Sequence, residues 1–253
     1  MDLVGDLLAR DRRTGDTALV TPDGRDRTYH DLITNGYKAA NVLRYLGVRA
    51  GAIVAVDPTP AFHTTLAFLG AAAVGAPVRF DPEAGIDAGD RVVLAPLPVA
   101  AELDPAPGTN LAAFDGSPER PETTHWEQEL WSENPGTPPS EVGPDDAAIV
   151  GPAGEFSHRD LCSLAAAAVE ATEMTAETRV VLRRPFSDVP AVAAGLVAPL
   201  SVGATAVLAP PSGVPEAADE SAEPRGDVAV APAETTVPEP RRIDPASIAP
   251  TPD

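Results

Sequence analysis

The sequence predicts an α/β fold in which parallel-rich sheets carry helices on their faces. Short apolar segments rich in Val, Ile and Leu alternate with longer segments whose apolar residues recur every three to four positions, and Gly or Pro separates them. This alternation favours parallel strands, because parallel neighbours need a crossover that a helix usually supplies. A chain of 253 residues is long enough for one large domain or two small ones.

The amino-terminal part, residues 1–114, contains most of the expected elements. Strands are predicted at 17–21, 27–29, 53–56, 77–80, 91–95 and 111–114, and helices at 3–10, 29–46 and 61–74. Thr28 followed by Asp31 resembles a capping box at the start of the second helix. Gly47 can end that helix in a left-handed conformation.

A second structured part is expected over residues 145–208. Its predicted strands are 147–150, 179–182 and 205–208, and its helices are 158–174 and 189–200. Ser157 and Asp160 form another capping box, before the first of these helices. We therefore expect one domain over residues 1–208, made of two subdomain-like halves.

The remaining segments differ in composition. Residues 115–144 are predicted to be a Pro-rich loop joining the two halves. Trp126 and Trp131 either pin this loop to the core, which is the preferred interpretation, or mark a docking site. Residues 209–253 are rich in Pro, Ala, Glu and Asp and lack aromatic residues, which predicts a disordered acidic tail.

The charge balance limits the partners. The chain has 38 acidic and 18 basic residues, a formal net charge of -20, and Lys38 is its only lysine. Such an acid excess suits a cytosol at molar salt, where screening weakens self-repulsion, so we expect a halophilic source. It disfavours nucleic acid and anionic membranes as partners, because both require clustered basic residues.

Cysteine usage and hydropathy point to a soluble cytoplasmic protein. Cys162 is the only cysteine, which excludes an intramolecular disulfide and a Cys-rich metal site. Residues 1–6 lack the basic region and apolar core of a signal peptide. The most apolar segment, 191–208, is interrupted by Gly and Pro and does not predict a membrane span.

Several motifs, taken in order, resemble the AMP-forming acyl-CoA synthetases, the adenylate-forming or AMP-binding family. They are TYHDL (28–32), GVRAG (47–51), VAV (54–56), LGA (69–71) followed by GAP (75–77), SHRDL (157–161) and GLVAPLSVGAT (195–205). The family pattern has one more residue before the proline that is Pro77 here. The two matching segments cover roughly half of the chain. The resemblance implies a partial amino-terminal domain of that fold.

The same resemblance places the family's phosphate-binding loop at residues 151–155. That loop is rich in Ser, Thr and Gly and ends in Lys-Gly, whereas this turn has no Ser, Thr or Lys, and Pro152 has no N–H to donate. Glu155 adds a carboxylate. Gly151, Gly154 and Ser157 are the candidate nucleotide-binding residues. No catalytic residue is predicted, and ATP with Mg²⁺ is expected only if the chain is active.

Other possible sites have simpler structural explanations. His158 and Cys162 lie four residues apart on one predicted helix, but two ligands do not complete a metal site, so burial near the helix start is preferred. His30, His63 and His125 show no ligand spacing. Asp145 and Asp146 are expected to be solvated turn residues rather than a metal pair, and no metal site is predicted.

Three functions remain open. The first is a truncated, catalytically degenerate synthetase-like protein with a binding or regulatory role, which pairs with a full-length synthetase or with itself. The second is an AMP-forming acid–thiol ligase, or a half-enzyme completed by a partner chain. The third is a structural interaction domain whose acidic tail is the working part. The missing phosphate donors favour a non-catalytic protein.

Overall fold

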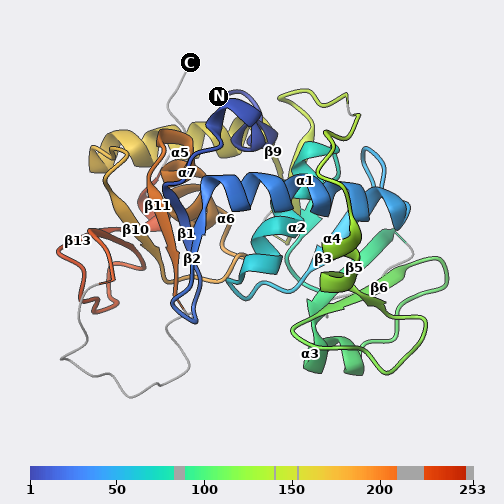
Figure 1. The fold of residues 1–253 in the computed structure, drawn as a ribbon. Coiled ribbons are helices and arrows are strands. Elements are labelled where there is room, and N and C mark those ends of the chain that lie inside the picture. Colours follow the sequence, from blue (N-terminus) through green and yellow to red (C-terminus); the bar gives the residue numbers. More distant parts are fainter. Residues whose placement is uncertain (83–88, 140, 153, 210–224, 249–253) are drawn as a thin grey trace.

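The protein is built around two β-sheets that lie next to each other, with long helices packed against them (Figure 1). The computed structural model describes residues 1–82, 89–139, 141–152, 154–209 and 225–248. Among these residues, no helix is long and apolar enough to cross a membrane. The predicted α/β class with parallel-rich sheets is confirmed.

The first sheet has six strands in the order β13-β12-β10-β11-β1-β2. All neighbours in it are parallel except the β1–β2 hairpin. Its strands are β1 (Thr17–Val20), β2 (Asp26–Thr28), β10 (Arg179–Leu182), β11 (Thr205–Leu208), β12 (Val228–Val230) and β13 (Arg241–Ile243). The central strands β10 and β11 are Val- and Leu-rich on both faces, as expected for a buried parallel sheet.

The second sheet has seven strands in the order β7-β6-β5-β3-β4-β8-β9. It is parallel except for the β8–β9 hairpin. Its strands are β3 (Ile53–Val56), β4 (Val78–Arg79), β5 (Asp90–Pro96), β6 (Asn110–Phe114), β7 (Thr124–His125), β8 (Ala147–Gly151) and β9 (Gly154–Ser157). The chain after β3 continues to β4 on one side and then returns to β5 on the other, so the strand order reverses at β3.

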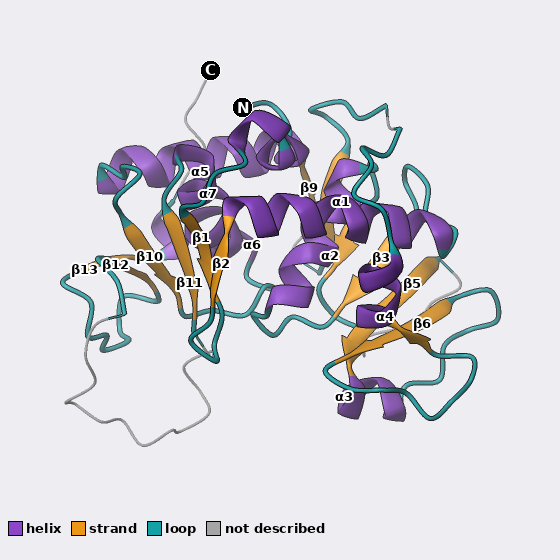
Figure 2. Cartoon of the chain, viewed as in Figure 1, coloured by secondary structure: helices purple, strands orange, loops and turns teal. Residues whose placement is uncertain are grey.

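The helices cover and connect the sheets (Figure 2). The longer ones are α1 (Tyr29–Tyr45), α2 (Phe62–Ala73) and α5 (His158–Thr172), and the shorter ones are α3 (Leu97–Glu102) and α4 (Trp126–Ser132). A continuous helical segment follows β10, made of α6 (Val189–Val192), a π-helical stretch (Ala193–Val197) and α7 (Ala198–Val202). Short 3₁₀ turns occur at Val4–Leu8, Arg10–Arg12 and Pro245–Ser247.

Small side chains allow the helices to approach closely. Gly70 of α2 faces Ala39 and Ala40 of α1, and a Cβ atom at Gly70 would lie 2.8 Å from the backbone nitrogen of Ala40. The core is accordingly dominated by Ala, Val and Leu. Both predicted capping boxes are present: Thr28 accepts from the backbone N–H of Asp31, and Ser157 from that of Asp160, each at 3.1 Å.

The predicted disordered tail is wrong for residues 225–248. Strand β12 pairs with β10, and β13 pairs with β12, which buries Val228, Val230 and Ile243. A three-residue strand needs only two inward apolar side chains, too few to give the periodicity that sequence patterns reveal. The other residues of that predicted tail beyond Ala209, 210–224 and 249–253, lie outside the described residues.

The predicted Pro-rich loop at 115–144 contains β7 and α4. Trp126 is fully buried and holds α4 against the core, whereas Trp131 is 87% exposed, so only one of the two tryptophans pins the segment. The two halves expected from the sequence do not each form one sheet. Strands β1 and β2 pair within the sheet of β10 and β11, and β8 pairs with β4.

Candidate functional site

The candidate phosphate turn is the tight connection between β8 and β9. The two strands pair antiparallel, with Gly151 opposite Gly154, so only residues 152 and 153 separate them. Gly154 has φ 114°, a conformation that favours glycine. No atom lies within 4 Å of a Cβ built at Gly151 or Gly154, so both face open solvent and no described wall encloses a ligand there.

The helix start beyond this turn has no free donors for an anion. The first backbone N–H groups of a helix normally make such a start a site for phosphate. Here the N–H groups of Ser157, His158, Arg159 and Asp160 donate to protein acceptors at 2.8–3.1 Å. The acceptors are the Asp160 carboxylate, the Asp146 and Pro144 carbonyls and the Ser157 hydroxyl.

The electrostatics of the turn also disfavour phosphate. The Ser157 hydroxyl donates to the Asp160 carboxylate at 2.7 Å, and Glu155 is exposed on the neighbouring strand. Arg159 is the nearby cation in the sequence, and its Nε donates to Asp145 at 2.9 Å. This hydrogen bond holds the pKa of the Asp145 carboxyl below its usual value. The candidate residues Gly151 and Gly154 thus lie in a β-hairpin, and Ser157 caps the following helix, with carboxylates around them.

His158 is buried at the helix start, as preferred from the sequence, whereas Cys162 is only half-buried. The His158 side chain is buried, its Nδ1 accepts from the backbone N–H of Val4 at 3.2 Å, and burial lowers the pKa of its imidazole. Cys162 is half-buried, and burial raises the pKa of its thiol to about 11. A thiol with so high a pKa is a poor nucleophile at neutral pH.

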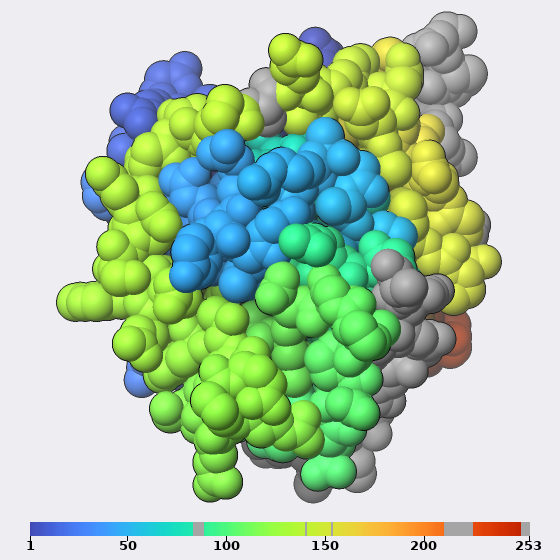
Figure 3. All heavy atoms as spheres, turned by 90° about the vertical axis from the view of Figure 1, so that its right-hand side faces the viewer, coloured from blue at the N-terminus to red at the C-terminus, as the bar shows by residue number. Residues whose placement is uncertain are grey.

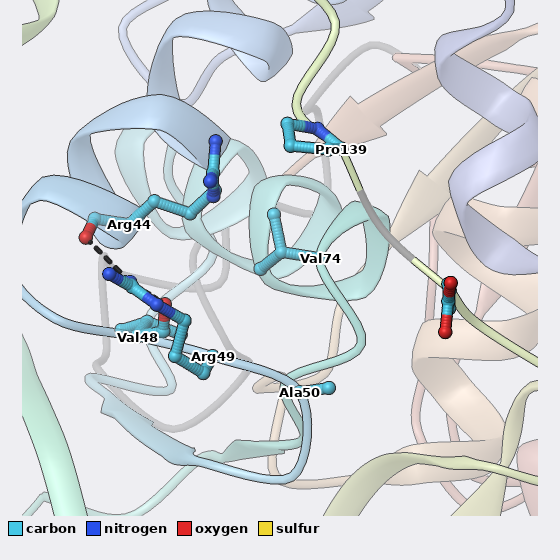
Figure 4. Close-up of a pocket in the computed structure, with 7 residues that line it drawn as sticks. Arg44, Val48, Arg49, Ala50, Val74 and Pro139 are labelled. Atoms are coloured by element: carbon cyan, nitrogen blue, oxygen red, sulfur yellow. Dashed lines mark hydrogen bonds between the residues drawn. The ribbon is translucent and has the colours of Figure 1, made fainter.

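A surface hollow that the sequence did not predict lies beside the carboxyl end of α1 (Figures 3 and 4). It has a volume of about 500 Å³ beside the carboxyl ends of α1 and α2, and its lining is Arg44, Val48, Arg49, Ala50, Val74, Pro139 and Glu141. Arg49 donates to the carbonyls of Arg44 and Val48, at 2.9 and 2.6 Å. It therefore satisfies one carbonyl in the last turn of α1 and one in the segment that follows the helix, which is a structural role.

The structure brings together three side chains that sequence spacing did not connect. His63 at the start of α2, Asp115 after β6 and Glu127 on α4 each place a potential ligand atom within 4.8 Å of the others. The sequence spacing of the histidines did not indicate that His63 would lie beside two carboxylates. The signal that could have found this cluster is topological, because all three residues follow parallel strands of one sheet and so meet at its carboxyl edge.

The fold has clear counterparts among solved structures. A benzoate CoA ligase from Burkholderia xenovorans matches 90% of this chain with a TM-score of 0.75 and 22% identity, over 50% of its own length. The anthranilate CoA ligase AuaEII, solved with anthranoyl-AMP, matches 82% of this chain with a TM-score of 0.71 and 20% identity, over 45% of its length. The N-terminal domain of FACL13 from Mycobacterium tuberculosis matches 83% of this chain, with a TM-score of 0.71 and 23% identity, over 58% of that structure.

These likenesses define the fold as that of the amino-terminal part of AMP-forming acyl- and aryl-CoA ligases. The chain spans about half the length of the ligases that it matches. By sequence alone, no family model and no curated protein matches the chain. Identities of 20–23% show a shared fold. They do not assign the activity of these ligases to this chain.

Proposed function

We propose that this chain is a cytoplasmic, non-catalytic relative of the AMP-forming acyl-CoA synthetases that acts by binding or regulation. The observation that carries the proposal is the start of α5, where all four leading N–H groups are satisfied within the protein. A phosphate there would have to displace the Asp160 carboxylate and lie near Glu155. The ligase fold with this closed turn favours a protein that has lost adenylation.

Adenylation requires what this turn lacks. Backbone donors and a lysine must hold the nucleotide phosphates and stabilise the negative charge that develops in the transition state. Lys38, the only lysine, lies in α1 and not near the turn in sequence. An enzyme would need cations and donors from elsewhere.

A second candidate is an AMP-forming acid–thiol ligase, or a half-enzyme completed by another chain. It is favoured by the fold match to a ligase solved with its acyl-adenylate. In that case ATP and Mg²⁺ would be the cofactors, and a partner chain would supply the missing donors. The two candidates differ in whether this chain binds ATP.

Calorimetry with ATP and Mg²⁺ in molar KCl separates the two candidates, with an intact benzoate CoA ligase as the positive control. The non-catalytic proposal predicts no saturable heat at millimolar ATP. Saturable binding that is followed by pyrophosphate exchange with a panel of carboxylic acids would overturn it. The matched variant Asp160→Asn weakens the helix cap but does not supply the backbone donors and the lysine that hold the phosphates. This variant is therefore also expected not to bind ATP.

The proposed partner is a full-length synthetase or a second copy of this chain. Size-exclusion chromatography with light scattering in molar KCl measures self-association, and the same column run with a full-length synthetase tests the mixed complex. A monomer in both runs would count against the pairing. The third function, a working acidic tail, loses support because residues 228–230 and 241–243 are strands of the first sheet.

A further inference from the structure

The carboxyl edge of the second sheet is where this topology places a ligand site. The chain leaves β3 towards β4 on one side and returns to β5, β6 and β7 on the other. At such a reversal the connecting segments diverge, and ligands of open α/β sheets bind there, beyond the carboxyl ends of the strands. The segments following β3, β6 and β7 carry His63, Asp115 and Glu127, respectively.

Three side chains of different chemistry converge at this edge. Nε2 of His63 lies 3.9 Å from Oε1 of Glu127. The backbone N–H of Asp115 donates to the same Glu127 oxygen at 2.6 Å, which fixes the Glu127 carboxylate beside the Asp115 backbone. Asp115 has φ 59°, a left-handed conformation that Asp tolerates better than most residues. This turn keeps the Asp115 side chain next to Glu127 and His63.

Two polar atoms of the cluster are buried without a hydrogen bond among the described residues. They are Nδ1 of His63 and Oε2 of Glu127; Nε2 of His125 lies 3.5 Å from that oxygen without forming a hydrogen bond to it. A buried polar atom without a partner destabilises the folded state, so such atoms in one cluster call for an explanation. A bound cation would give the Glu127 oxygen the partner that it lacks.

The charges around the cluster favour a divalent cation. Asp115 and Glu127 contribute two carboxylates, and Arg27, whose guanidinium lies 4.5 Å from the centre of the Phe62 ring, is the cation acting on His63. The carboxylates therefore outnumber the nearby cation. His125 places Nε2 3.5 Å from Oε2 of Glu127, as an outer partner that orients a ligating carboxylate would.

One imidazole and two carboxylates suit a first-row transition metal. Zn²⁺ and similar ions bind imidazole nitrogen and carboxylate oxygen at about 2.0–2.2 Å, so two of their ligand atoms are at most about 4.4 Å apart. The atoms here lie within 4.8 Å of one another, and Asp115 is exposed and Glu127 half-exposed. Rotation of the exposed Asp115 carboxylate would shorten its distances to the other two ligand atoms, while Glu127 keeps its hydrogen bond to the Asp115 N–H.

We propose that His63, Asp115 and Glu127 bind one divalent transition-metal ion at the carboxyl edge of the second sheet, with His125 orienting Glu127. The site is separate from the β8–β9 turn and does not depend on whether the chain binds ATP. Solvent or a small anionic ligand completes the coordination of the ion. The site joins the segments after β3, β6 and β7.

The test is titration of the chelator-treated full chain with ZnCl₂ by calorimetry and with CoCl₂ by visible absorption. Molar KCl and millimolar Mg²⁺ occupy the weak carboxylate sites of so acidic a surface. Asp115→Asn and Glu127→Gln each remove one ligand charge and keep the shape of the side chain. Glu129→Gln, on the same helix as Glu127, and His30→Asn, an exposed histidine, are the matched controls.

The proposal predicts one saturable site with micromolar or tighter affinity in the wild type and in both controls. Each ligand variant weakens binding by about tenfold or more, and His125→Gln weakens it by about tenfold, the effect typical of an outer partner. Asp115→Asn is a surface change that leaves folding intact, as circular dichroism would verify. Absence of a saturable site, or equal binding by Asp115→Asn, Glu127→Gln and Glu129→Gln, would overturn the proposal.

Discussion

The ion pair between Arg183 and Glu239 attaches the carboxyl-terminal strands to the first sheet. Arg183 directly follows β10, and Glu239 lies between β12 and β13. Nε and Nη2 of the guanidinium donate to the two carboxylate oxygens at 3.0 and 2.7 Å. The Glu239 side chain is fully buried and that of Arg183 is 16% exposed. Replacing Glu239 with Gln therefore leaves a largely buried guanidinium without its counter-charge.

The expected cost follows from this burial. Breaking a buried ion pair costs about 3–5 kcal/mol, and the partial exposure of Arg183 places Glu239→Gln near about 3 kcal/mol. The matched control is Asp145→Asn in the Arg159–Asp145 pair, whose side chains are 55% and 82% exposed, so that solvent screens the pair and its loss should leave the unfolding midpoint nearly unchanged. The double variant Arg183→Met/Glu239→Leu should be more stable than Glu239→Gln, because it leaves no buried charge.

Urea unfolding in molar KCl, followed by circular dichroism and tryptophan fluorescence, measures these differences from the transition midpoints. Thermal unfolding gives a second measure, and about 3 kcal/mol corresponds to roughly 6–12 °C for a chain of this size. The reasoning is refuted if Glu239→Gln and Asp145→Asn shift the midpoint equally. That result would mean that residues 225–248 contribute nothing to the cooperative unit.

Three further predictions concern single residues. Gly70→Ala should destabilise by about 1–3 kcal/mol in urea unfolding, because its Cβ would meet the Ala40 backbone at 2.8 Å, whereas Gly15→Ala, in open space, should not. Burial lowers the pKa of His158, so the folded state stays neutral while the unfolded state, with pKa 6.5, binds protons. Stability should be unaffected above about pH 6.5 and fall as pH drops below it, and His158→Asn should flatten this dependence in urea midpoints measured across pH. Iodoacetamide should alkylate Cys162 about 100-fold more slowly in the folded than in the unfolded chain at pH 8, since burial raises the pKa of its thiol from 9.0 to about 11; equal rates would refute this.

Elements with a strong local signal could be predicted from the sequence. Strands Ile53–Val56, Arg179–Leu182 and Thr205–Leu208 have the predicted bounds, because three or four consecutive apolar or β-branched residues between turn signals leave little choice. The starts of α1 and α5 were also predictable, because a capping box fixes a helix start through hydrogen bonds between residues three apart.

Other elements depend on distant partners. Strand β12 has three residues and becomes a strand because β10 offers it an open edge. Helix α4 has two buried residues, Trp126 and Leu130, four positions apart, and a seven-residue helix gives no sustained period. The cluster around His63 depends on the order of strands in a sheet, which sequence spacing does not contain.

At the candidate phosphate turn, a local sequence signal predicts the secondary structure correctly, but whether the turn can bind phosphate depends on its three-dimensional contacts. The capping box of Ser157 and Asp160 makes α5 predictable, and it also occupies two of the N–H groups that a phosphate would need. The carbonyls of Pro144 and Asp146 occupy the next two, through a loop that the sequence could not position. Asp160→Ala would therefore free at most part of the helix start and leave Glu155 in place. Anion binding could return only if the segment before β8 also moved, and this coupling makes the closed turn a stable property of the fold.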